Sequence, residues 1–232
     1  MFKKLIFIVL ISTFSFSVHA QFAGGSGTEE DPYLIESKFD LKYLSENSGL
    51  WSKDFKQISD IYFSTEDFSA NGEFYYDGKG FLPIANLYAE AFSGTYNGNG
   101  KIIDSLYINR NSSGDNSDGG LFGFIKYSDI KNLSLTNVNI KGRSSVGALA
   151  SGSHLSEINN VYVTGEIEIE SGYIGGLIGA TEWTTITHSS CDCIVISNAS
   201  SDAGGIVGWL LDASKIQFTY STGKVSGSTV GG

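Results

Sequence analysis

The sequence predicts an all-β fold, a right-handed parallel β-helix with three faces and about 28 residues per coil. Two repeats that keep the same phase carry this prediction. A glycine-framed phrase recurs as GGLFG at 119–123, GALAS at 147–151, GGLIG at 175–179 and GGIVG at 204–208, and GG starts again at 231–232. At a fixed offset, an isoleucine opens a short alternating run at Ile130, Ile158, Ile186 and Ile216.

The length of the repeat favours a β-helix over other repeat folds. Three short strands at about 3.3 Å per residue, with three turns, use about 28 residues, whereas a propeller blade needs about 40–45. Leucine-rich repeats would require a helical stretch between the strands, and none is visible. Leu121, Leu149, Leu177 and Ile206 are expected to stack in one inward column and the four isoleucines in another. The paired glycines indicate sharp corners with positive φ or a close approach of backbones.

The first residues have the pattern of a secretory signal peptide. Lys3 and Lys4 precede an apolar stretch, and Val18-His19-Ala20 forms a small-residue exit. We therefore expect cleavage after Ala20 and export, with the mature chain secreted or on the cell surface. Three parts are predicted, a signal peptide at 1–20, an N-terminal cap with the first irregular coils at 21–118, and repeat coils at 119–232.

The mature chain is expected to be acidic and not to insert into a membrane. Removing Lys3 and Lys4 from 15 basic residues leaves 13 against 25 acidic ones, a net charge of −12. Arg110 and Arg143 are the only arginines, so the sequence offers no basic patch for nucleic acid or anionic lipid. No segment after the signal approaches the roughly 18 apolar residues that a membrane-spanning helix needs.

The segment after the signal predicts a cap for the first coil. Ser37 as N-cap, Asp40 in the first turn and Asn47 at the end indicate a short amphipathic helix, well placed to cover the open end of the solenoid. Its neighbours are predicted from alternation and turn residues: strands at 33–35 and 55–63, a surface excursion at 64–80, coil-like strands at 81–84 and 91–108, and a polar loop at 109–118.

Several phrases together resemble bacterial surface proteins with GLUG motifs. These are GSGTEEDPYLI at 25–35, Asp60-Ile61, AFSGTYNGNGKIIDSLYI at 91–108 and the recurring GGLxG units. The resemblance covers nearly all of the mature chain and implies a right-handed β-helix that is secreted or exposed on the cell surface, often within a larger adhesin, without catalytic residues. Asn97 stands where the family usually has Asp, and Ala148 and Ser151 replace glycines of the second unit.

Cys191 and Cys193 are the only cysteines. A metal site would need more thiols or nearby histidines. Cys191 falls in the column of Leu135 and Val163 and is predicted to be a small core residue, while Cys193 falls at a turn position. A disulfide between two cysteines this close is the alternative, and the sequence leaves their oxidation state open.

Acidic and histidine side chains are weighed as catalytic or metal-binding groups. Glu166, Glu168 and Glu170 alternate with isoleucines along one strand, so they predict a solvated face rather than a pair of carboxylates across a cleft. Asp115 and Asp118 are weak candidates for a cation site, and His154 and His188 are expected at the surface. No catalytic residue, metal or cofactor is predicted.

Exposed aromatic residues are the better functional candidates. Tyr75, Tyr76, Trp183 and Trp209 do not fit the inward columns, as Tyr162 also does not, and are predicted to contact a glycan or a protein partner. The function predicted is a non-catalytic exported module for cell-surface adhesion or for rigid spacing within a larger surface protein. The alternative is a carbohydrate-binding protein or a polysaccharide-degrading enzyme on the same fold. Since the chain stops two residues into a new unit, we expect further domains of the same polypeptide downstream.

Overall fold

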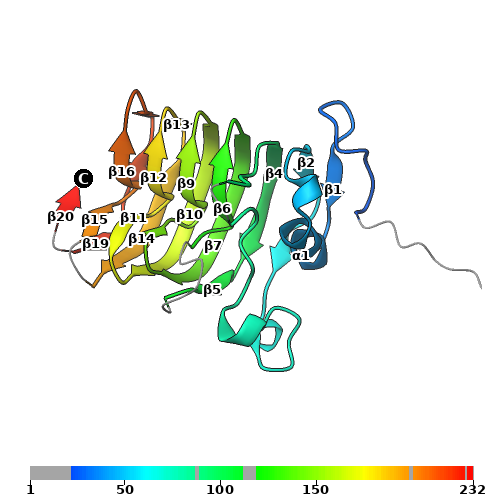
Figure 1. Cartoon of the computed structure of the whole chain (residues 1–232), viewed down its shortest axis with the longest axis horizontal. Coiled ribbons are helices and arrows are strands. Elements are labelled where there is room, and N and C mark those ends of the chain that lie inside the picture. Colours follow the sequence, from blue (N-terminus) through cyan, green and yellow to red (C-terminus); the bar gives the residue numbers. More distant parts are fainter. Residues whose placement is uncertain (1–21, 87–88, 112–118, 199–200, 228, 232) are drawn as a thin grey trace, which may run out of the picture.

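The computed structural model describes residues 22–86, 89–111, 119–198, 201–227 and 229–231, and the predicted signal peptide lies outside them. Within these ranges the chain winds into a parallel β-solenoid, with the strands of successive coils side by side (Figure 1). One twelve-stranded and two four-stranded sheets form its walls. The predicted parallel β-helix is therefore confirmed.

The strands fall into these three sheets. The twelve-stranded sheet contains β1 (Tyr33–Ile35), β2 (Phe55–Gln57), β3 (Ile61–Tyr62), β4 (Thr95–Asp104), β5 (Tyr107–Asn109), β7 (Asp129–Gly142), β10 (Glu157–Ile169), β13 (Thr185–Thr187), β14 (Ser190–Ser197), β17 (Lys215–Gln217), β18 (Tyr220–Ser221) and β19 (Lys224–Ser226). One four-stranded sheet contains β8 (Ser145–Val146), β11 (Gly172–Gly175), β15 (Ser201–Gly204) and β20 (Thr229–Gly231). The other contains β6 (Phe122–Lys126), β9 (Ala150–His154), β12 (Ile178–Glu182) and β16 (Val207–Leu211).

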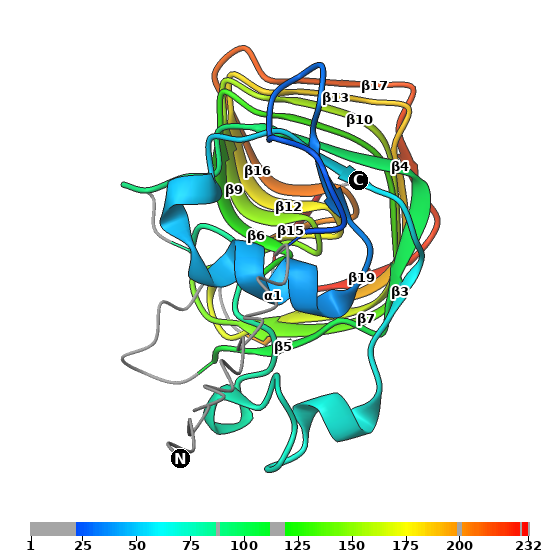
Figure 2. The same ribbon diagram turned by 90° about the vertical axis from the view of Figure 1, so that its right-hand side faces the viewer.

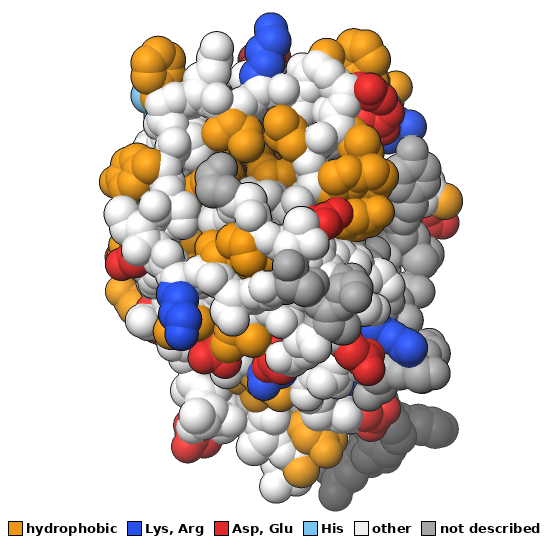
Figure 3. All heavy atoms as spheres, turned by 90° about the vertical axis from the view of Figure 1, so that its left-hand side faces the viewer, with side chains coloured by type: hydrophobic (Ala, Val, Ile, Leu, Met, Phe, Trp, Pro, Cys, Tyr) orange, Lys and Arg blue, Asp and Glu red, His pale blue; other side chains and the backbone are white. Residues whose placement is uncertain are grey.

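The sequence repeat is the rung of the solenoid. Ile130 pairs with Ile158, Ile158 with Ile186, and Ile186 with Ile216, as the column predicts. The first three side chains are buried, because each has a rung on both sides. Ile216 lies on the last described rung of its sheet and is partly exposed, as are Leu210 and Tyr220 near it. Figure 3 looks onto this end of the solenoid and shows hydrophobic side chains at its surface.

The number of strands differs between coils and is not always the predicted three. The third coil contains β11, β12, β13 and β14, and its glycine pair begins at the last residue of β11. In the two preceding coils β7 and β10 each run through positions that β13 and β14 occupy separately. The physical reason is that β7 and β10 pair with each other on both sides of the corner, so one long bent strand covers two faces.

The glycine pairs are required by close backbone approach. A Cβ on Gly175 would lie 2.1 Å from the carbonyl oxygen of Ile178, and one on Gly176 would lie 2.3 Å from Sγ of Cys191. Neither residue has positive φ. Of the two reasons predicted for these glycines, crowding therefore applies and left-handed backbone does not.

The predicted cap helix is present as α1 (Lys38–Glu46), with Ser37 as N-cap and Asn47 as C-cap. Asp40 Oδ2 accepts hydrogen bonds from the backbone N–H groups of Ser37 at 2.8 Å and Glu36 at 2.9 Å, which satisfies donors that a helix start leaves free. Leu41 and Leu44 are fully buried. Figure 2 shows α1 crossing the end of the coils, where it covers the first rungs.

The predicted single strand at 55–63 is instead the two short strands β2 and β3, which pair with different parts of β4. The excursion at 64–80 contains the short 3₁₀ helices η2 (Thr65–Phe68) and η3 (Tyr76–Gly78), and a third, η1 (Ser48–Leu50), follows α1. The excursion is not simply a surface loop, because Phe74 is fully buried against Phe63 and Phe81. Phe74 thus joins the same hydrophobic core as the side chains inside the coils.

Cys191 and Cys193 are joined by a disulfide and are both buried. Cys191 pairs with Val163, and Val163 with Leu135, so the predicted column is confirmed. The turn predicted for Cys193 is wrong, because this residue lies inside β14. Side chains two residues apart on a strand face the same side, so both sulfurs point inward while Asp192 is exposed.

Candidate functional site

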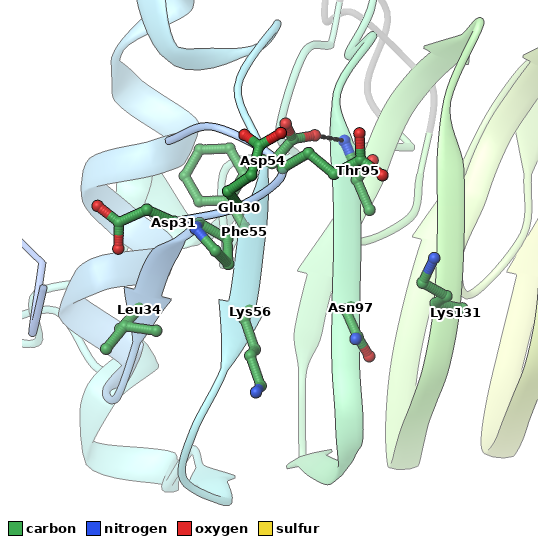
Figure 4. Close-up of a pocket in the computed structure, with 11 residues that line it drawn as sticks. Glu30, Asp31, Leu34, Asp54, Phe55, Lys56, Thr95, Asn97 and Lys131 are labelled. Carbon is green, nitrogen blue, oxygen red and sulfur yellow. Dashed lines mark hydrogen bonds between the residues drawn. The ribbon is translucent and has the colours of Figure 1, made fainter. Parts of the chain in front are cut away.

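A cleft of ≈ 410 Å³ lies at the N-terminal end of the solenoid, beside β1, β2, β4 and β7. We call it the N-terminal cleft (Figure 4). Its lining consists of Glu29, Glu30, Asp31, Pro32, Leu34, Asp54, Phe55, Lys56, Thr95, Asn97 and Lys131. The register that brings these residues together is that of the sheet, since Leu34 pairs with Lys56, Lys56 with Asn97, and Asn97 with Lys131.

Several polar groups of the N-terminal cleft already have partners within the protein. Asp54 Oδ1 accepts a hydrogen bond from the backbone N–H of Thr95 at 3.0 Å, which ties β4 to the segment before β2. Asn97 Oδ1 accepts from the backbone N–H of Asn99 at 2.9 Å and from Nδ2 of Asn132 at 3.3 Å. Lys131 forms an ion pair with Asp129. These contacts explain local structure, and they occupy groups that a ligand would otherwise use.

Two charged residues of the N-terminal cleft, Asp31 and Lys56, do not face Asp54. In Figure 4 the side chains of Asp31 and Lys56 point away from the carboxylate of Asp54. Glycoside hydrolysis needs two carboxyl groups across the scissile bond, and Figure 4 does not show that arrangement for Asp31 and Asp54. Mixed carboxylate, ammonium and amide groups instead suit hydrogen bonding to a polar ligand.

A second polar surface runs along the outside of the same sheet, across successive rungs. Its first row consists of Asp129, Glu157, Thr185 and Lys215, and its second row of Lys131, Asn159, Thr187 and Gln217. The two rows flank the buried isoleucine column, so alternation along each strand turns them outward. Asn159 Nδ2 donates to Oγ1 of Thr187 at 2.7 Å, which links neighbouring rungs. We call these two rows the outer strip.

Tyr127, Leu155 and Trp183 form a column at the corner beside the first row of the outer strip. The backbone N–H of Tyr127 donates to the carbonyl of His154 at 3.1 Å, and that of Leu155 donates to the carbonyl of Glu182 at 3.1 Å, so the three residues occupy equivalent places on successive rungs. Their exposed fractions are 63%, 42% and 50%. We call them the corner column.

The four aromatic residues predicted as ligand contacts do not form one site. Trp183 belongs to the corner column, whereas Trp209 lies on β16 and stacks on Tyr173 at 4.3 Å between ring centroids. Tyr75 and Tyr76 lie in the excursion and are partly buried. The Tyr76 hydroxyl donates to Glu46 of α1, and burial together with this carboxylate raises the pKa of Tyr76. Tyr162, the fifth aromatic considered, is exposed on β10.

The acidic strand residues are solvated as predicted, but they also have partners. Glu168 accepts hydrogen bonds from Lys141 at 2.6 Å and Asn198 at 2.6 Å, and Glu170 pairs with Arg143 at 3.2 Å. Lys141 lies beside Glu168 in the register, so the neighbouring rung supplies this partner. The Lys141 hydrogen bond lowers the pKa of Glu168, and the same bond raises the pKa of Lys141.

Both histidines lie at rung edges with neighbours on the next coil. His154 Nδ1 is 3.0 Å from Oε2 of Glu182, and the His188 ring stacks on Phe218 at 5.1 Å. Asp115 and Asp118 lie outside the described residues. Among the residues that are described, no group of three or more His, Cys, Asp or Glu side chains is placed to hold a metal ion. No described helix is long and apolar enough to cross a membrane.

Comparison with known proteins gives partial matches of limited length. No family model matches the chain. It is 36% identical to halomucin of Haloquadratum walsbyi over 170 residues, which is 73% of this chain and 2% of that protein. It is also 36% identical to an immunoglobulin A1 protease of Streptococcus sanguinis over 124 residues, which is 48% of this chain and 7% of that protein. The chain thus spans only a small part of these curated relatives.

A solved structure shares the fold. A crystal structure of a candidate immunoglobulin A1 protease from Bacteroides ovatus superposes with a TM-score of 0.54, covering 87% of this chain and 78% of that one at 17% identity. At this identity the likeness shows the fold alone. It agrees with the β-solenoid described above and carries no information on catalysis by this chain.

Sequence reasoning missed the outer strip and two members of the corner column. The signal was present, because Tyr127, Leu155 and Trp183 each stand three residues before a column isoleucine. Leucine at the middle position hid the pattern, since leucine in a β-helix is usually assigned to the interior. The N-terminal cleft was also missed, because it joins residues from four segments that only the coil brings together.

Proposed function

We propose that this chain is a non-catalytic, exported β-solenoid module that acts in cell-surface adhesion or as a rigid spacer of a larger surface protein. The observation that carries the proposal is the layout of the outward side chains. They repeat in rows from rung to rung, as Asp129, Glu157 and Thr185 do, rather than converging on one point. An extended repeating surface suits attachment, whereas catalysis needs groups gathered around a reacting bond.

Three further observations support this proposal. The first residues have the pattern of a signal peptide, the phrases of the chain resemble those of GLUG-motif surface proteins, and the partial matches are to much longer proteins. A solenoid also suits a spacer, because each rung contacts only its neighbours and the length grows with the number of rungs. The disulfide between Cys191 and Cys193 is consistent with an oxidising compartment outside the cytosol.

The location is tested by immunolabelling intact cells of the source organism with antibodies raised against residues 22–231. Labelling without permeabilisation is expected, with a cytosolic protein as the negative control. Labelling that appears only after permeabilisation would overturn the surface role. The non-catalytic part is tested by incubating the mature chain with polysaccharides and with immunoglobulin A1, and then measuring product size. Shortened products that disappear with a variant of an acidic cleft residue, such as Asp54→Asn, would overturn it.

A further inference from the structure

The solenoid has three columns of residues with left-handed backbone, one at each of three corners. One column contains Ser105, Asn137 and Gly165, with φ of 59°, 52° and 132°, and all three residue types suit such a corner. A second column contains Asn132, Asn160, His188 and Phe218, at 55°, 54°, 50° and 53°. Asparagine and glycine are the residues that adopt positive φ most readily. Tolerant residues therefore occupy the first column and the first two places of the second, which ends with the stacked rings of His188 and Phe218.

The corner column contains no asparagine or glycine at its three positions. Tyr127, Leu155 and Trp183 have φ of 57°, 48° and 52°, where bulky side chains are strained. Burial does not offset the strain, because these side chains are about half-exposed or more. Tyr127 gains only an edge contact with His154 at 6.2 Å and the ammonium of Lys126 at 5.3 Å from its ring. Strained side chains that stay about half-exposed at repeated positions indicate a binding function.

The surface next to these rings supplies hydrogen-bonding groups at the same repeat. Asp129 lies two residues after Tyr127 along the chain, and Asn159 lies four residues after Leu155. Asp129 and Lys131 form an ion pair, so their charges offset each other locally. The outer strip thus presents carboxylate, amide and hydroxyl groups in rows beside the two rings and the leucine of the corner column.

We propose that the outer strip and the corner column form a binding site for an extended, neutral polysaccharide that lies along the solenoid axis. This inference rests on the proposed function and names the ligand of the adhesion module. The rings of Tyr127 and Trp183 stack on the apolar faces of sugar units, and the outer strip hydrogen-bonds the hydroxyl groups along one edge of the polymer. The two rings are two rungs apart, about 10 Å, a span that two sugar units of an extended chain cover.

Two features favour this ligand over others. A formal net charge of −10 repels polyanions, so an acidic polysaccharide is disfavoured. A protein partner typically buries a compact apolar centre surrounded by a polar rim. Here the apolar groups form a narrow line with polar rows on one side, which matches a linear polymer that has one apolar face and hydroxyl edges.

The test is affinity gel electrophoresis of the mature chain in gels that contain one polymer each. The neutral probes are hydroxyethyl cellulose, arabinoxylan, galactomannan and barley β-glucan, and polygalacturonate is the acidic comparison. At least one neutral polymer is expected to slow the protein more than polygalacturonate does. If none of the four neutral polymers slows it, or if polygalacturonate slows it more, the inference is overturned.

Site variants then test the location. Tyr127→Asn and Trp183→Asn remove a ring but leave a residue that fits positive φ, as Asn132 and Asn160 do, so both variants are expected to fold. Each should weaken binding at least tenfold, and the double variant more. The matched control is Tyr62→Asn on β3, because Tyr62 is 60% exposed, close to the 63% of Tyr127. A control that loses as much affinity as the site variants, or site variants that lose none, would contradict this site.

The two proposals fail separately. Surface labelling of cells without binding to any neutral polymer would leave the adhesion or spacer role standing and overturn the polysaccharide site. Polymer binding that depends on Tyr127 and Trp183, together with shortening of the polymer, would keep the site and overturn the non-catalytic role.

Discussion

The N-terminal part of the solenoid fills its core with rings, whereas the later coils fill theirs with aliphatic side chains. Phe55, Phe74, Phe81, Phe92 and Tyr96 are all buried in the first part. After Phe122, the buried apolar residues of the described chain are isoleucine, leucine, valine, alanine and cysteine. The first coils are irregular and meet a helix, so large side chains fill uneven space. The later coils are alike, so small side chains stack on copies of themselves.

This difference teaches how each part is stabilised. In the later coils, the register places like side chains on top of one another, so the core packs by stacking. Each rung therefore depends on the close approach of its backbone to the next rung. In the first part, individual large side chains and internal hydrogen bonds matter more. Gln57 is an example, because this fully buried amide donates to the carbonyl groups of Ser59 at 2.8 Å and Ile102 at 2.9 Å. The following predictions test this comparison.

The largest effect is expected from Phe55→Ala in the ring-filled core. Phe55 contacts Phe22 and Tyr33, each at 5.7 Å between centroids, and Phe92 at 6.1 Å. Its removal should lower the free energy of unfolding by about 3–5 kcal/mol, measured by denaturant titration followed by circular dichroism. Phe39→Ala on the exposed face of α1 is the control and should cost less than about 1 kcal/mol. Equal losses would contradict the assignment of Phe55 to the core.

Gly176→Ala should break the close approach between rungs. The added Cβ would lie 2.3 Å from both Sγ of Cys191 and the carbonyl oxygen of Gly205, so the backbone must shift. A loss of about 1–3 kcal/mol in the free energy of unfolding is expected. Gly49→Ala is the matched control, because a Cβ at Gly49 has no neighbouring atom within 4 Å. Should both variants unfold at the same denaturant concentration, crowding is not the reason for the glycine pair.

Tyr96→Phe tests the internal hydrogen bonds of the first part. The hydroxyl of Tyr96 donates to Oε1 of Gln57 at 3.1 Å, and burial raises the pKa of this tyrosine, so it stays protonated. Losing the donor leaves a buried amide oxygen without this partner and should cost about 1–2 kcal/mol. Adding Gln57→Leu to this variant removes the oxygen that lost its donor. Gln57→Leu should therefore lower the free energy of unfolding less in the Tyr96→Phe variant than in the wild-type protein. If the two single changes lower the stability measured in thermal melts by strictly additive amounts, the hydrogen bond between Tyr96 and Gln57 is unimportant.

The smallest effect is expected for the surface pair of Lys141 and Glu168. The lowered pKa of Glu168 means that its contribution is present above its ordinary value of 4.5 and is lost as the pH falls through the lower folded value. The raised pKa of Lys141 means that its contribution is lost as the pH rises above 10.5. At neutral pH, Lys141→Met should cost about 0.2–1 kcal/mol, and this difference from wild type should shrink in acid. Lys224→Met, at an exposed lysine, should show no such pH dependence.

Much of the fold could be predicted because the spacing of a sequence repeat shows which residues are paired on neighbouring coils. The interval between Ile130 and Ile158 is one coil, so the sequence alone aligned residues that lie side by side. Helix α1 was also predictable, because its cap residues Ser37 and Asp40 act within four residues of one another. The corners were less predictable. Whether β10 bends through a corner unbroken, or divides as β13 and β14 do, depends on hydrogen bonds to the neighbouring rung.

The sequence by itself determined the coil, its period, the inward columns and the cap helix, because these follow from local alternation and from identical spacing. Only the tertiary structure decided which outward residues share a surface. Trp183 was visible as an unusual residue, but its alignment with Tyr127 and its left-handed backbone appear only when the rungs are stacked. The same is true of Cys193, whose inward direction depends on where β14 begins, and of the N-terminal cleft. Contacts between distant segments depend on how the coils close, and no single stretch of the chain encodes that closure.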